Sequence, residues 1–123
     1  MDLKKAPGLL AEKLAGKYLR KQGFRILEER YRTKFGELDL ICRKKRELVF
    51  VEVRSLETDS GMSIEETILP KKISHIVKSA KSWILKKGLK NLAVRFDVVT
   101  VDLSSEPPKI NHYPAAFESE IDL

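Results

Sequence analysis

The sequence has little cysteine, few aromatic residues and no long apolar run. Cys42 is the only cysteine among 123 residues, so an intrachain disulfide is excluded and a reducing, cytoplasmic setting is expected. No stretch approaches the roughly 18 apolar residues of a membrane span. The first 19 residues carry Glu12 and several lysines, which is unlike a signal peptide. Repeats and low-complexity segments are also missing. We therefore expect a cytoplasmic protein without a membrane partner.

What is present favours one folded domain with a basic surface. Hydrophobic residues make up 42% of the chain and charged residues 34%, which is apolar enough to fold. The length favours a single domain, 1–123, with one core. Lysine and arginine outnumber Asp and Glu by 24 to 18, giving a net charge of +6. This balance favours a polyanionic partner, with nucleic acid ahead of an anionic membrane.

Apolar periodicity predicts two helices and four to five strands. The expected elements are a helix over 8–22, strands over 24–31, 37–43 and 47–53, a helix from Pro70 to Gly88, a strand over 94–103 and a fifth strand over 109–113. The expected connections are a basic loop over 31–36, a hairpin turn over 43–46, an acidic loop over 55–69 and a flexible tail over 114–123, which leaves a core of about 8–113.

These elements predict an α/β fold with a mixed sheet of four to five strands and helices on both faces, in the order α-β-β-β-α-β. Short turns make the first three strands antiparallel. The second helix is long enough to carry the chain back across the sheet, so the fourth strand should run parallel to one of them.

Carboxylates stand inside the apolar hairpin FGELDLICRKKRELVFVEVR, residues 35–54. Side chains alternate along a strand, so Glu37 and Asp39 share a face, and Glu52 and Arg54 share a face on the next strand. A two-residue turn makes paired positions sum to 91, which sets Asp39 opposite Glu52. A sum of 89 leaves them diagonal on one face, and an even sum separates them.

Two carboxylates about 5 Å apart across strands repel each other unless a cation lies between them. Mg²⁺ takes one or two carboxylates together with waters and phosphate oxygens, and it can activate a water. The plainer interpretation, which spacing alone favours, is a half-exposed sheet in which Glu37 and Asp39 meet water and Glu52 pairs with Arg54. Glu12 has no basic partner at i+3 or i+4, so an ordinary surface position and a place near these acids both fit it.

The segments AEKLAGKYLRKQGFRILEERYRTKFGELDLI and VFVEVR resemble the YraN-like family of small bacterial proteins. That family is regarded as endonucleases related to Holliday-junction resolvases and restriction-endonuclease-like nucleases. The resemblance covers about 8–113 and is most specific at 36–41 and 49–54. It implies a restriction-endonuclease-like core and metal-dependent hydrolysis of DNA phosphodiester bonds, with branched or junction DNA as a candidate substrate. Resolvases act as dimers, so a homodimer is also a candidate.

The same resemblance implies roles for individual residues. Asp39 and Glu52 would hold Mg²⁺ or Mn²⁺, Glu12 would assist the metal or the water, and Arg54 stands where the motif usually carries lysine. Arginine stays protonated, so Arg54 could stabilise phosphate charge but not act as a base. Water activation would then fall to the metal, to Glu12 or to Glu37.

Two further departures from the family pattern concern basic positions. Leu56 stands where a second basic residue is common, and Arg30 stands where asparagine is common. These departures keep open a non-catalytic nucleic-acid-binding protein of the same fold. An interaction protein with a charged sheet face is a third hypothesis.

Basic residues flank the acidic strand and predict phosphate contacts. The candidates are Arg30, Arg32 and Lys34 before that strand, and Lys72, one turn into the second helix. Such side chains would contact phosphates without reading sequence. A solvated charged surface is the alternative.

Overall fold

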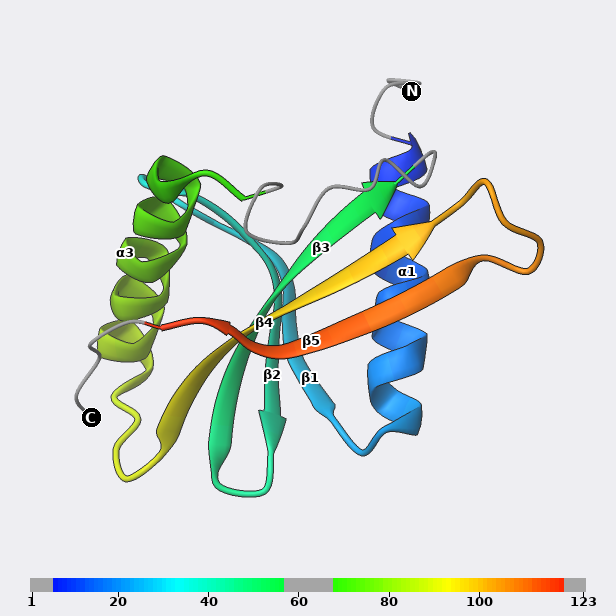
Figure 1. The fold of residues 1–123 in the computed structure, drawn as a ribbon. Helices are drawn as coiled ribbons and strands as arrows, with labels where there is room; N and C mark the ends of the chain where they lie inside the picture. Colours follow the sequence, from blue (N-terminus) through cyan, green and yellow to red (C-terminus); the bar gives the residue numbers. More distant parts are fainter. Residues whose placement is uncertain (1–5, 57–67, 119–123) are drawn as a thin grey trace.

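The computed structural model describes residues 6–56 and 68–118 and shows a five-stranded sheet with a helix on each side (Figure 1). In chain order the elements are α1 (Ala6–Lys21), β1 (Arg25–Thr33), β2 (Gly36–Lys44), β3 (Glu47–Leu56), α3 (Pro70–Lys87), β4 (Ala93–Asp102) and β5 (Lys109–Phe117). The strands lie in the order β1-β2-β3-β4-β5, and β3 and β4 are parallel while the other neighbours are antiparallel. The predicted α/β class, mixed sheet and element order are confirmed, with the fifth strand present.

Each face of the sheet has its own apolar core under one helix. The core under α1 contains Ala11, Ala15, Leu19, Phe24, Leu40, Cys42, Val49, Val51, Val99 and Val101. The core under α3 contains Leu38, Ile41, Leu48, Phe50, Ile76, Ala80, Trp83, Ile84 and Phe96. Central strands covered on both faces read as near-continuous apolar runs, which explains the sequences of β2, β3 and β4. Because Phe50 faces α3, the next residue on the same row of β3, Glu52, faces α3 as well.

The helices end at the predicted glycines. Gly23 has a φ of 91°, and Gly88 has a φ of 65°, both in the left-handed region that favours glycine. The Gly88 N–H closes α3 by donating to the carbonyl of Ile84 at 3.0 Å. Pro70 begins α3, as its fixed φ favours. Neither helix in the described part of the chain is long and apolar enough to cross a membrane.

Several predicted connections were too long, because pairing with neighbours extends the strands. Residues 32–33 extend β1 beyond its predicted end at residue 31, and residues 55–56 complete β3. The predicted tail is wrong over 114–117, since β5 continues to Phe117, whose ring stacks on Phe96 at 5.1 Å. Residues 57–67 of the predicted loop and 119–123 of the tail lie outside the described residues.

Candidate metal centre

The sheet divides into two arms at the end where the acids lie. The β2–β3 ladder has the predicted two-residue turn and register, from Lys44 opposite Glu47 to Leu40 opposite Val51. Beyond that pair the strands part, and β2 continues only with β1 while β3 continues only with β4. Figure 1 shows the β1–β2 arm curving toward α3 and the β3–β4 arm running toward α1. Asp39 and Glu52 therefore stand where the strands diverge and are not a ladder pair.

A hydroxyl contact attaches the β1–β2 arm to α3. The side-chain oxygens of Thr33 and the buried Ser79 lie 2.8 Å apart. The Thr33 hydroxyl also accepts the N–H of Phe35 at 3.0 Å and donates to the carbonyl of Gly36 at 3.1 Å. This anchor fixes the tip of the arm and, through it, the direction in which Glu37 approaches the site.

Asp39 bridges the opening between the arms. Its Oδ2 accepts the backbone N–H of Val53 at 2.8 Å, so the carboxylate is held against β3. Its carboxylate also shares a hydrogen bond with the buried carboxyl group of Glu52. Glu52 Oε1 lies 3.6 Å from Lys72 Nζ and 3.8 Å from Arg54 Nη1.

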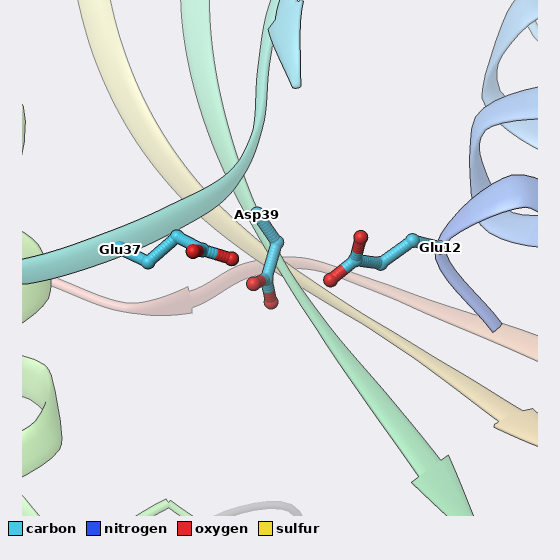
Figure 2. Close-up of side chains that lie close together, drawn as sticks. All are labelled: Glu12, Glu37 and Asp39. Carbon is cyan, nitrogen blue, oxygen red and sulfur yellow. The ribbon is translucent and has the colours of Figure 1, made fainter. Parts of the chain in front are cut away.

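The Asp39 carboxylate also lies close to two further carboxylates, those of Glu12 and Glu37. Glu12 comes from α1, and Glu37 and Asp39 come from β2, and the side chains point toward one another (Figure 2). One oxygen from each lies within 4.8 Å of the others. Oxygens on opposite sides of a Mg²⁺ ion lie about 4.2 Å apart, because each bond is about 2.1 Å long. This all-oxygen donor set fits a hard divalent cation after small side-chain rotations.

Burial, and to a smaller extent neighbouring negative charge, raises the pKa of Glu12, Asp39 and Glu52. Burial, and then the charge of Asp39, raise the pKa of Glu12 to about 7, although Arg30 opposes the shift. Burial and Asp39 likewise raise the pKa of Glu52 to about 8, against the influence of Lys72. Burial also raises the pKa of Asp39. Protons thus reduce a repulsion that a bound cation would relieve more completely.

Arg30 acts as an internal counter-ion of this cluster. Its Nε lies 3.6 Å from Glu12 Oε2 and 3.6 Å from Glu37 Oε1. Its φ is 52°, in the left-handed region where asparagine is favoured over most residues. The structure places the exposed Arg30 side chain beside two of the acids, and its contact with phosphate stays a prediction.

The other predicted phosphate contacts lie around the same site. Lys72 pairs with Glu52, and Arg32 Nη2 lies 3.6 Å from Glu37 Oε2 with a 79% exposed side chain. The ammonium group of Lys34 lies 5.2 Å from the centre of the Phe35 ring, at the tip of the β1–β2 arm.

Sequence reasoning left some functional candidates unassigned. Glu37 was placed beside the predicted pair without a ligand role, and its i+2 spacing from Asp39 was the available signal. His75 received no role, although it follows Lys71 by four residues and therefore lies on the same side of α3. Lys71 and His75 line a pocket together with Lys72.

Comparison with known proteins gives the family. The model of the uncharacterised protein family UPF0102 matches residues 11–101. A UPF0102 protein of Anaeromyxobacter dehalogenans is 43% identical over 119 residues, covering 97% of this chain and 89% of its own. A UPF0102 protein of Thermotoga neapolitana is 47% identical over 103 residues, covering 84% of this chain and 90% of its own. The structure of Pyrococcus furiosus SfsA in complex with Ca²⁺ covers 94% of this chain and 65% of that chain, with 18% identity and a TM-score of 0.34, too low to support any conclusion about this protein. The matched span and these identities show that the chain belongs to the uncharacterised protein family UPF0102, the YraN-like family that its motifs predicted.

Proposed function

We propose that this protein is a metal-dependent endonuclease that hydrolyses phosphodiester bonds in DNA. The observation that carries the proposal is the position of Asp39, which is within shared-ligand distance of Glu12 and Glu37 and hydrogen-bonded to Glu52. Cationic side chains of α3 and β3 lie directly beside this group. Oxygen ligands for a divalent cation next to positive charge for a phosphate are what phosphodiester hydrolysis requires.

The acidic residues of the site would hold the metal, each from its own position. Asp39 would be the central ligand of Mg²⁺ or Mn²⁺, held in place by the Val53 N–H, with Glu12, Glu37 and Glu52 around it. When bound, the metal supplies an acidified water and neutralises charge on the phosphate.

Positive side chains and substrate class complete the proposal. Lys72 and Arg54 would orient the phosphate, and Arg54 would not accept a proton. The family resemblance favours branched or junction DNA, acted on in the cytoplasm by a homodimer.

A second candidate is a nucleic-acid-binding protein of this fold without turnover. Two observations favour it. The Arg30 guanidinium group already lies between Glu12 and Glu37, where a metal would compete with it. Arg54 also replaces the lysine of the motif.

Cleavage assays distinguish the two functions. Branched and linear DNA would be incubated with Mg²⁺ or Mn²⁺ and the wild type, Asp39→Ala or Glu52→Ala. Loss of a metal ligand should slow cleavage by about 100-fold or more. Glu106→Ala, at an exposed acid in the β4–β5 connection, is the matched control and should cleave normally.

Other outcomes point elsewhere. Cleavage that survives both site substitutions would overturn the site. Binding of DNA without cleavage by the wild type would support the non-catalytic protein. No binding even at low salt would favour an interaction protein.

A further inference from the structure

A second pocket lies beside Glu52, on the side away from Glu12. It has a volume of about 360 Å³ and is lined by Arg54, Leu69, Lys71, Lys72 and His75. Lysine, arginine and histidine thus contribute four of the five lining residues that the structure describes. None of these described residues is a carboxylate, whereas Glu12 and Glu29 line the other pocket.

The described linings of the two pockets therefore differ in charge, because acids and bases are mixed beside Glu12 and only basic groups accompany Leu69 in the second pocket. Lys72 and Arg54 connect them, because both lie within 4 Å of Glu52 Oε1 and both line the basic pocket. Lys71 is exposed and His75 is half-buried, so both are accessible to a ligand. Lys72 and Arg54 share Glu52 as a partner, and a bound phosphate would place further negative charge beside these basic groups.

We propose that this pocket binds a backbone phosphate of a nucleic-acid strand, next to the phosphate held at Asp39 and Glu52. The proposal rests on the proposed function and adds a direction to it, because the strand would run from the basic pocket across Glu52 toward Glu12. Lys71 and His75 donate hydrogen bonds to the neighbouring phosphate, and Lys72 and Arg54 lie between the two phosphates. A diester phosphate offers only acceptor oxygens, which matches a pocket whose charged groups are donors.

Histidine NMR tests the pocket directly, because the described chain provides a reporter and an internal control. His75 lines the pocket, whereas His112 Nε2 lies 2.7 Å from Asp97 Oδ2 in a separate network. The probe is the trinucleotide TpTpT, which has only internal phosphates, added with EDTA so that no metal takes part. The His75 imidazole signals should shift saturably, and those of His112 should not. Inorganic phosphate and pTpTpT, added separately, show whether a terminal phosphate is preferred. Preference for a terminal phosphate would overturn the assignment to a backbone phosphate.

Matched lysine variants test the same pocket by binding. Lys71→Ala removes a lining charge, and Lys86→Ala removes an exposed charge in the last turn of the same helix. With a longer oligothymidylate, the slope of log affinity against log salt should fall by about 0.7 for Lys71→Ala, the value of one lost phosphate contact on a single strand. It should be unchanged for Lys86→Ala. Equal effects of the two variants, or an unmoved His75 signal at saturation, would overturn the proposal.

These outcomes are independent of the cleavage assay. A shifted His75 signal in a protein that never cleaves DNA would retain the pocket and refute the nuclease. Metal-dependent cleavage together with equal salt slopes for Lys71→Ala and Lys86→Ala would retain the nuclease and refute the pocket.

Discussion

The carboxylate of Asp97 in β4 is completely buried, and donors surround it. It accepts hydrogen bonds from Arg95 Nε at 2.8 Å and Arg95 Nη2 at 3.0 Å, from the Ala115 N–H at 2.9 Å and from His112 Nε2 at 2.7 Å. Burial by itself raises a carboxyl pKa, but the hydrogen bonds from His112, Arg95 and Ala115 outweigh it and lower the pKa of Asp97. Asp97 ties β5 to β4 as a charged but satisfied part of the core.

Asp39 in β2 has the opposite surroundings. One backbone N–H donates to it, and its remaining close neighbours include Glu12, Glu37 and Glu52. Burial and then the charge of Asp39 raise the pKa of Glu12 and of Glu52, and burial raises the pKa of Asp39 itself. Two aspartates of one sheet therefore differ in their surroundings. Donors within the protein stabilise the charge of Asp97, whereas an added cation would stabilise the group of acids around Asp39. Perturbed carboxyls of the second kind mark functional sites.

The largest expected effect is the loss of protein stability when Asp97 is substituted. Asp97→Asn should lower the free energy of unfolding by about 3 kcal/mol, because Arg95, His112 and the Ala115 N–H lose a charged acceptor, although Arg95 keeps its pairing with Glu47. Urea denaturation followed by circular dichroism measures the change. A midpoint close to that of the wild type would show that Asp97 is not the anchor described.

Asp39→Asn should give the opposite pattern. The free energy of unfolding should stay unchanged or rise, because one of the crowded charges is removed. Mn²⁺ affinity should fall about 100-fold, which corresponds to about 2.7 kcal/mol. Calorimetric titration measures affinity and urea denaturation measures stability. If Asp39→Asn unfolds as readily as Asp97→Asn, the contrast between the two aspartates is wrong.

The two regions should also respond oppositely to pH. Glu12 and Glu52 have folded-state pKa values raised to about 7 and about 8, so the stability linked to them is complete below their ordinary value of 4.5 and is lost as the pH rises through 7 and 8. Asp97 has a lowered pKa, so its contribution is present above 3.8 and is lost as the pH falls through its folded-state value.

Thermal denaturation without metal measures this difference. Between about pH 5 and pH 8 the Tm should fall by about 4 °C or more, the change that about 1 kcal/mol produces in a small domain. Glu52→Gln should flatten the upper part of that decline, and Mn²⁺ should restore Tm at pH 8, because metal binds the deprotonated ligands. A flat profile across this range would contradict the crowded site.

The smallest expected effect comes from the internal counter-ion. Arg30→Asn should raise Mn²⁺ affinity about twofold to fivefold, because a partly exposed ion pair is worth up to about 1 kcal/mol. Arg32→Asn is the matched control, since Arg32 contacts Glu37 but no contact between it and Glu12 occurs in the described residues. Calorimetry with both variants is the measurement. Equal affinities for the two variants would mean that Arg30 does not compete with the metal.

Much of the scaffold could be predicted from local pattern. The glycines that end the helices, the proline that begins α3 and the two-residue hairpin turn each depend on the conformational preferences of a few neighbouring residues. The alternation in β3 also placed Glu52 and Arg54 on one face, where both interact at the candidate centre. The family followed from the same motifs.

The meeting of the acids could not be predicted in this way. The register rule treats the β2–β3 ladder as continuous, whereas it ends at Leu40 because the β1–β2 arm is held to α3 by Thr33 and Ser79. A helical wheel places Glu12 on the flank of its helix without giving its distance from β2. The pairing of Arg30 with Glu12 and Glu37 was not predicted either, because sequence does not give the distance between β1 and these acids.

The sequence by itself determined the elements, their order, the hairpin register and the acids of that hairpin, because hydrogen bonding along the chain and the alternation of buried side chains depend on near neighbours. The tertiary structure decided which carboxylates share a site and which of them have a raised pKa. Crowding between charges depends on distance in space, and Glu12, Asp39, Glu52 and Lys72 come from four elements that only the packed sheet brings together.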